Sequence, residues 1–426
     1  MSARKDSFVA GLIASRGNEE ACRAGLEAAQ RRAQECEPWL KAFVYRPDAY
    51  ETGDAATKPL AGVPIGVKDL MATRDMPTTY GSPIYAGFRP AEDAWIVERI
   101  RAFGGVVFGK TVTTEFAWRE PGPTVNPWNR LHTPGGSSSG SAAAVGAGIV
   151  PLAIGTQTVG SVIRPAAFCG VVGYKPSHGT VPSAGVHPLA PSLDHIGFFS
   201  RTVEGAALCH ALFVDARPDA IADINAWNEY FAMRRPRKLG VVRTPFWARV
   251  SDEQKANFEV TLARLQAAGA TLVELDPFDS MQSMLDALQT ILQVEACRAI
   301  GPAAAKHPKL MSQHMLALTA AGAAVPAENY VAALALQARV RNEYEAWVDG
   351  CDAMVTVPAT GAAPEGLADT GDATFCAPWS LLGVPAVTVP SGRSQDGLPL
   401  GFQVLGRHGG DLQTLQTAAW IETVLG

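Results

Sequence analysis

The chain has 426 residues, of which 47% are hydrophobic, and its formal net charge at pH 7 is −5. A chain of this length can bury a large core without disulfides or metal ions. Its charge does not favour binding to nucleic acid or to an acidic membrane surface, and we interpret the one basic run, residues 234–238, as a solvated linker.

The first half of the chain predicts helices and buried strands in alternation. Residues 6–36 carry Ala, Leu, Glu, Gln and Arg at helical spacing, which predicts one helix. The apolar run 63–67 predicts a buried strand that brings Lys68 and Asp69 to a site. Further helices are expected over 94–103 and 139–148, and further strands over 105–109 and 152–155.

The second half begins with a βαβ pattern. Strands are expected over 239–242 and 270–275, with a helix between them that opens at the capping box 251–254. Residues 280–348 are mostly helical in pattern, strands follow over 353–357, 386–390 and 400–405, and a last helix covers 411–424. Strands that alternate with helices predict an α/β layered fold with a mixed sheet. We expect one domain over residues 1–426, with 205–350 as a helix-rich peripheral region.

The cysteines and the apolar stretches indicate a cytoplasmic protein. Seven cysteines without a CxxC pair are typical of reduced thiols. No apolar run follows the first six residues, so we expect no secretory signal. The longest nearly apolar stretch, 142–155, contains Pro151 and is too short to cross a membrane.

Two short motifs match known patterns without their structural context. Residues 104–111 fit the phosphate-binding pattern GxxxxGK[ST], but their Val-Val-Phe centre predicts a buried strand instead of a loop. Residues 136–140 fit GxSxG with Ser138 as the nucleophile. That elbow needs a preceding hydrophobic strand, and a loop is expected there. The histidines show no metal-binding spacing.

A third combination joins Lys68 to two glycine–serine loops, which start at residues 135 and 156. A serine nucleophile needs a base, and a lysine can serve as one if burial lowers its pKa. A glycine before the serine lets backbone N–H groups form an oxyanion hole. The spacing alone leaves open whether these segments meet or are a strand end and two unrelated turns.

Seven pieces of the chain, in order, resemble the amidase signature family. They lie at residues 60–69, 109–117, 134–141, 155–165, 168–176, 378–386 and 397–403. The resemblance covers about 60–205 and 350–425. It implies an α/β fold with a mixed sheet of about eleven strands that helices cover on both faces.

The resemblance also implies roles for individual residues. Ser161 would be the acylated nucleophile, Ser137 the bridging serine with a cis peptide bond to Gly136, and Lys68 the base. Ser138 would be a loop residue. The oxyanion hole would consist of the N–H groups of Thr158, Val159, Gly160 and Ser161. No metal or cofactor is implied.

Two features depart from the usual family pattern. Gln157-Thr158-Val159-Gly160-Ser161 stands where many members have Asp-Thr-Gly-Gly-Ser, so Val159 puts a Cβ where glycine is usual. Arg164 lies three residues after the nucleophile, and it is a candidate clamp for a substrate carboxylate or a support for the loop. For Phe116, Trp118 and Trp379, substrate binding and core packing remain equal alternatives.

We therefore expect an amidohydrolase that cuts a linear amide C–N bond of a small molecule. One alternative is a urea- or carbamate-type hydrolase with the same machinery. Another is a glutamine amidase subunit of a tRNA-dependent amidotransferase, and a third is a non-catalytic scaffold. We expect no nucleic acid or membrane partner, and the resemblance implies that a homodimer is common among similar proteins.

Overall fold

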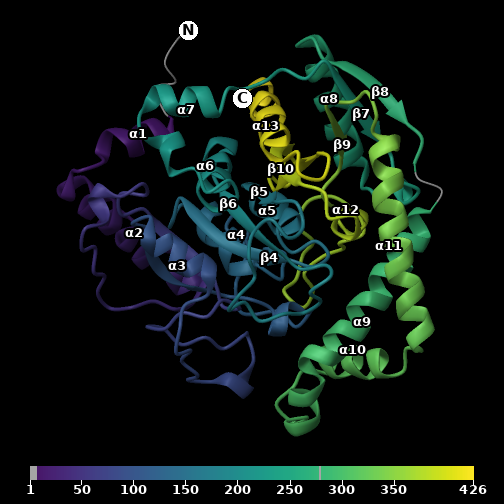
Figure 1. The fold of residues 1–426 in the computed structure, drawn as a ribbon, viewed down its shortest axis with the longest axis horizontal. Coiled ribbons are helices and arrows are strands. Elements are labelled where there is room, and N and C mark those ends of the chain that lie inside the picture. The colour runs from purple at the N-terminus through teal and green to yellow at the C-terminus, as the bar shows by residue number, and fades with distance from the viewer. Residues whose placement is uncertain (1–6, 278–279) are drawn as a thin grey trace.

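The computed structural model describes residues 7–277 and 280–426, and the eleven strands in these ranges form one sheet (Figure 1). From edge to edge the order is β1-β3-β2-β4-β6-β5-β10-β11-β9-β7-β8. The strands are β1 (Phe43–Tyr45), β2 (Pro64–Lys68), β3 (Val106–Thr111), β4 (Leu152–Gln157), β5 (Val172–Lys175), β6 (His195–Ser200), β7 (Lys238–Val242), β8 (Thr271–Leu275), β9 (Ala353–Thr356), β10 (Ala386–Arg393) and β11 (Pro399–Leu405).

The sheet contains both parallel and antiparallel pairs. β2 runs parallel to β3 and β4, and β7 runs parallel to β8 and β9. The other neighbouring strands pair antiparallel. The expected α/β class and the mixed sheet of about eleven strands are therefore confirmed.

Helices cover both faces of the sheet. Alternate residues of a strand point to opposite faces, and apolar residues on each face pack against the helices there. In β4, Leu152 and Ile154 pack in one cluster with α6 and α13, whereas Ala153 packs in another with α2 and α4. The helices are α1 (Phe8–Ser15), α2 (Glu19–Leu40), α3 (Trp95–Ala102), α4 (Ser139–Gly146), α5 (Ile163–Cys169), α6 (Val203–Phe213), α7 (Ile224–Tyr230), α8 (Asp252–Ala267), α9 (Met281–Lys306), α10 (Gln313–Ala323), α11 (Ala327–Trp347), α12 (Ala377–Leu382) and α13 (Asp411–Leu425).

Helices α9, α10 and α11 form a layer of their own at the side of the molecule (Figure 1). Their buried side chains, such as Leu288, Met315 and Val340, share a third cluster with Trp379 of α12. This layer lies in the region 205–350 that the sequence marked as helix-rich. None of the described helices is both long and apolar enough to cross a membrane.

The single helix expected over 6–36 is wrong, because the chain turns between α1 and α2. Gly17 has a φ of 80°, a left-handed conformation that glycine adopts without steric cost. The side chain of Asn18 then accepts a hydrogen bond from Ala21 N and caps α2. The Ala-rich pattern continues through this break, so periodicity alone did not reveal it.

The βαβ pattern and the strand within residues 104–111 are confirmed. β7 and β8 pair in parallel with α8 between them, and Ser251 Oγ accepts a hydrogen bond from Gln254 N at 3.3 Å. Val106–Thr111 is a strand with all six residues buried. A strand buried on both faces offers no loop of N–H groups to a phosphate.

Candidate active site

Strand β2, the third strand from the β1 edge of the sheet, carries Lys68 and lies between β3 and β4. The side chain of Lys68 is fully buried, and its Nζ lies 2.7 Å from Ser137 Oγ and 2.8 Å from Thr156 Oγ1. Within the described ranges, no carboxylate oxygen lies within 4.0 Å of this nitrogen. Burial lowers the pKa of Lys68 well below its ordinary value, and the charge of Asp194 opposes that shift only in part.

Ser137 lies in the loop before α4, and its peptide bond to Gly136 is cis, as the resemblance implied. Its neighbour Ser138 has a different role: Ser138 Oγ donates to Thr156 O at 3.1 Å. Ser138 is also fully buried. The position of Ser138 as a loop hydrogen-bonding residue agrees with the prediction and disfavours a GxSxG nucleophile.

Ser161 follows β4 and shares a cavity with Ser137. The cavity has a volume of about 530 Å³, and Ser137, Thr158, Val159, Gly160, Ser161 and Arg164 all line it. Lys68 therefore contacts Ser137, and Ser137 and Ser161 line the same cavity. Within the described part of the chain, the N–H groups of residues 158–161 have no hydrogen-bond acceptor. They remain available to an anionic oxygen.

Gln157 holds the loop that carries these N–H groups. Its side-chain oxygen accepts from Val162 N at 2.8 Å and Ile163 N at 3.0 Å, and its Nε2 donates to Ser380 Oγ at 3.0 Å. Ser380 Oγ in turn donates to Val159 O at 2.7 Å. A carboxylate in place of Gln157 could accept but could not donate to Ser380. Gln157, which replaces the aspartate usual in the family, thus has a hydrogen-bond partner on α12, Ser380.

Val159 fits the loop in spite of its Cβ. It is not among the described non-glycine residues with positive φ, so its backbone does not require glycine. Its side chain is half-buried and lines the cavity. Val159 therefore occupies cavity space while its N–H group stays in place.

Asp194 holds the start of the loop 158–161 through the side chain of Thr158. Its Oδ1 accepts from Thr158 Oγ1 at 2.6 Å, and its Oδ2 accepts from Leu189 N at 2.9 Å and Ala190 N at 3.0 Å. Burial raises the pKa of this carboxyl group, and the three hydrogen bonds oppose the shift. Sequence reasoning did not identify Asp194, because no local pattern links it to a loop 36 residues earlier.

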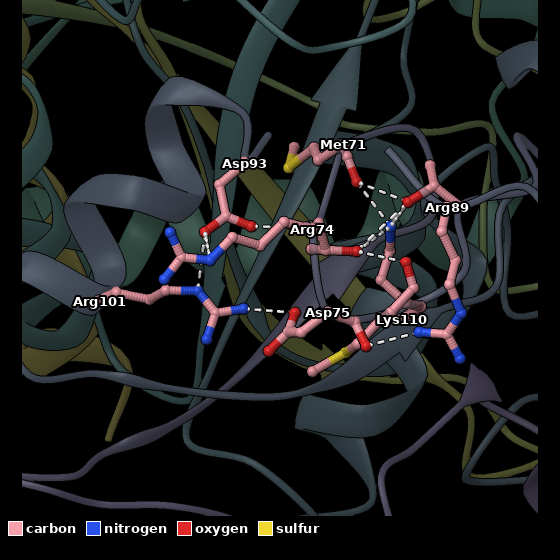
Figure 2. A network of polar contacts seen from close by, with 10 residues as sticks. Met71, Arg74, Asp75, Arg89, Asp93, Arg101 and Lys110 are labelled. Atoms are coloured by element: carbon pink, nitrogen blue, oxygen red, sulfur yellow. Dashed lines mark hydrogen bonds and ion pairs between the residues drawn. The ribbon is translucent and has the colours of Figure 1, made fainter. Parts of the chain in front are cut away.

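The loop that follows Lys68 is tied down by the polar network in Figure 2. Lys110 Nζ donates to Met71 O at 2.6 Å and pairs with Asp69 at 3.2 Å. Arg101 contacts Asp93 at 3.0 Å, in the same network. Asp69, the residue after the catalytic candidate Lys68, is thus paired with Lys110.

Arg164 is buried in the cavity wall and has no ion pair with any described carboxylate. Its Nη2 donates to Gly136 O at 2.7 Å and to Thr370 Oγ1 at 3.1 Å, while its Nε has no partner. These contacts support the loop that carries Ser137. They also leave guanidinium N–H groups unused, so both alternatives from the sequence remain compatible with this geometry.

Phe116 and Trp379 lie behind the cavity wall. Each is 1% exposed and packs in the apolar cluster beneath α9, and neither is among the described residues that line the cavity. Their positions favour core packing over substrate contact. Trp118, two residues after Phe116, does line the cavity.

Several cavity residues had no signal in the sequence. They are Arg119 after the turn Glu115–Ala117, Leu285, Leu288 and Gln289 of α9, His314 of α10, and residues 368–374. The α9 and α10 residues come from the helix-rich peripheral region 205–350. Their helical periodicity did not distinguish cavity-lining residues from core residues.

The family model described as Amidase matches residues 25–415. The chain belongs to the amidase family. It is 36% identical to a glutamyl-tRNA(Gln) amidotransferase subunit from Symbiobacterium thermophilum, with 86% of this chain and 84% of that protein covered. The corresponding protein of Chlamydia pneumoniae is 31% identical, with 84% of this chain and 80% of that protein covered.

Solved structures of the family share the fold along nearly the whole chain. A crystal structure of an amidase gives a TM-score of 0.83 at 29% identity and covers 97% of this chain and 100% of that one. Peptide amidase from Stenotrophomonas maltophilia gives a TM-score of 0.79 at 26% identity, with 99% and 97% covered. This member of the amidase family is thus an enzyme that acts on amide carbon–nitrogen bonds.

Proposed function

We propose that this amidase-family enzyme hydrolyses a small linear amide through an acyl-enzyme on Ser161, with Ser137 and Lys68 as the proton relay. One observation carries the proposal: a fully buried lysine without a nearby carboxylate lies 2.7 Å from Ser137 Oγ, beside the cavity that also holds Ser161. Burial favours the neutral amine, which is the form that can accept a proton.

In the first half-reaction, Lys68 accepts the Ser137 proton and Ser137 accepts the Ser161 proton, while Ser161 Oγ attacks the amide carbon. The carbonyl oxygen becomes an oxyanion that the free N–H groups of residues 158–161 stabilise. The relay then returns the proton to the departing nitrogen as the C–N bond breaks. Water attacks the acyl-enzyme in the second half-reaction, and its proton passes through the relay to Ser161.

The preferred substrate carries a carboxylate close to the scissile bond, as malonamate does. Arg164 supports this part of the proposal because it is a buried cation beside Ser137 with unused N–H groups. A guanidinium pairs with a carboxylate through two parallel hydrogen bonds. Urea derivatives with an anionic end fit the same arrangement.

An amide panel tests the substrate class. Ammonia release is compared for malonamate and its neutral counterpart malonamide, for succinamate, and for ureides. We expect malonamate to have the higher kcat/KM. Arg164→Lys keeps a positive charge in the buried site, and it should raise KM for malonamate more than for malonamide. Equal losses on both substrates would mean that Arg164 only supports the loop.

A second candidate function is a glutamine amidase subunit, which the similarity to the two amidotransferase proteins favours. Free glutamine in the same panel separates the two candidates. Glutamine hydrolysis that exceeds malonamate hydrolysis would support the amidotransferase alternative and argue against the small anionic amide.

A further inference from the structure

Three guanidinium groups reach the catalytic cavity: Arg119, Arg164 and Arg249. Arg249 has a close ion pair with Asp372 and donates to Thr374 Oγ1 at 2.8 Å. For Arg119 and Arg164, no carboxylate of the described residues lies within the 4.0 Å ion-pair distance. Among the described residues of the cavity, Arg119 and Arg164 are thus two guanidinium groups without an ion-pair partner.

The cavity carboxylates are already engaged elsewhere. Asp372 pairs with Arg249, and its Oδ1 also accepts from Thr374 N at 2.8 Å. Asp369 accepts a hydrogen bond from Gly371 N within its own turn. Burial lowers the pKa of Arg164, the nearby aspartates oppose this shift, and the positive charge of Arg119 adds to it. The effect of Arg119 on Arg164 is smaller than that of the two aspartates.

The backbone of the segment that carries Arg119, residues 116–119, adopts an unfavourable conformation beside the cavity. Phe116, Ala117 and Arg119 have φ values of 46°, 63° and 44°. This left-handed region is unfavourable for residues with a Cβ, and such strain concentrates at functional sites. Phe116 N donates to Tyr80 O at 2.8 Å, which helps to hold the turn.

Further contacts hold this segment in place and orient the Arg119 side chain. The buried carboxylate of Glu115 accepts from Ser82 Oγ at 2.7 Å and from Ser312 N at 2.9 Å. It thereby connects the turn to the start of α10, which forms another wall of the cavity. The Arg119 guanidinium lies 5.1 Å from the centre of the Trp118 ring, and both side chains line the cavity. A stacked guanidinium keeps its N–H edge free for a ligand.

We propose that Arg119 is a second anion-binding position of the active site, and that the preferred substrate carries two anionic groups. This inference rests on the proposed function, in which Arg164 binds the first carboxylate. A second carboxylate would pair with the guanidinium of Arg119, which lines the cavity. Arg119 then determines specificity for the distal part of the substrate and takes no part in the proton relay.

Binding of dicarboxylates tests the inference without turnover. Isothermal titration calorimetry on the intact protein compares malonate, succinate, glutarate and adipate. Each is paired with the hydroxy acid of the same length, in which one carboxylate is replaced by a hydroxymethyl group. At least one diacid should bind about fivefold more tightly than its hydroxy acid, the upper range for an exposed ion pair. In Arg119→Gln this difference should disappear, and in Arg119→Lys part of it should remain.

Arg130→Gln provides the matched control. Arg130 is also an exposed arginine over an indole ring, 4.3 Å from the centre of Trp39, but it lies outside the cavity lining. This variant should keep the full preference. Equal binding of diacids and hydroxy acids, or a preference that persists in Arg119→Gln, would overturn the inference. The proposed function is checked separately, because hydrolysis of malonamate by the same samples reports the relay and Arg164.

Discussion

Lys68 Nζ lies 2.7 Å from Ser137 Oγ, in a position with no solvent exposure. A lysine that has lost its hydration and has gained no adjacent carboxylate is less favourable in its charged form. The same geometry gives it a hydroxyl group from which to accept a proton.

Replacement of the nucleophile is the first test. Ser161→Ala should reduce amide hydrolysis to background, because no other hydroxyl group of the relay can form the acyl-enzyme. The fold should persist, as measured by circular dichroism and by the unfolding temperature. Ser138→Ala is the matched control, because Ser138 bonds to Thr156 instead of lining the cavity. It should retain activity and lose about 1 kcal/mol of stability.

Replacement of the base is the second test. Lys68→Met should lower kcat by about 10³-fold or more, since a positioned base contributes on the order of 10²–10⁴ in rate. Lys68→Arg should be equally inactive, because a guanidinium does not release its proton in proteins. Thr156→Val removes only the second contact of Lys68 Nζ and should cost far less. Full activity in Lys68→Met would disprove the relay.

The pH dependence gives the third prediction. The active form has neutral Lys68, so kcat/KM should rise with pH through the Lys68 pKa and then level off. Burial lowers that pKa, so the rise should be complete well below 10.5. Asp194→Asn removes the negative charge that raises the Lys68 pKa, and the rising limb should move to lower pH. A shift to higher pH would contradict this assignment.

Val159 gives the fourth prediction. Val159→Gly keeps the backbone N–H group and removes a side chain from the cavity wall. Rates for malonamate should therefore change only a few-fold, whereas amides with bulkier acyl groups should gain in kcat/KM. Kinetics on acyl groups of increasing size measure the effect. An equal loss for every acyl size would instead indicate that the loop has lost its shape.

Lys175 gives a prediction about stability. It is fully buried, and burial lowers its pKa to about 7, with Asp411 opposing. Between that value and 10.5 the unfolded chain binds a proton that the folded chain does not, so stability rises with pH. This group contributes a slope of about 1.4 kcal/mol per pH unit. Denaturant unfolding measures the free energy of unfolding of wild type and of Lys175→Met between about pH 8 and pH 9. We expect the difference, wild type minus variant, to increase with pH along that slope.

The sequence predicted those parts of the fold that local patterns encode. The Ser251 cap, the βαβ unit and the strand within 104–111 follow from capping, periodicity and β-branched residues. The eleven-strand sheet and the relay came from the resemblance to a family, because spacing alone could not bring together Lys68 and two serine loops. The break at Gly17 was missed because the apolar pattern runs through it.

The rest of the site depends on contacts between segments that are distant in sequence. Asp194 reaches Thr158, Glu115 reaches Ser312, and Gln157 reaches Ser380 across 223 residues. A polar residue in such a contact has the same local appearance as one on the surface. The positive φ values at Phe116 and Arg119 were equally hidden, because neither position carries a glycine.

The most direct test of the relay is intact-protein mass spectrometry after treatment with a fluorophosphonate probe, followed by peptide mapping. The account predicts one adduct, on the peptide that contains Ser161, and a strongly reduced labelling rate in Lys68→Met. An adduct on Ser138, or labelling of Ser161 at an unchanged rate without Lys68, would contradict it.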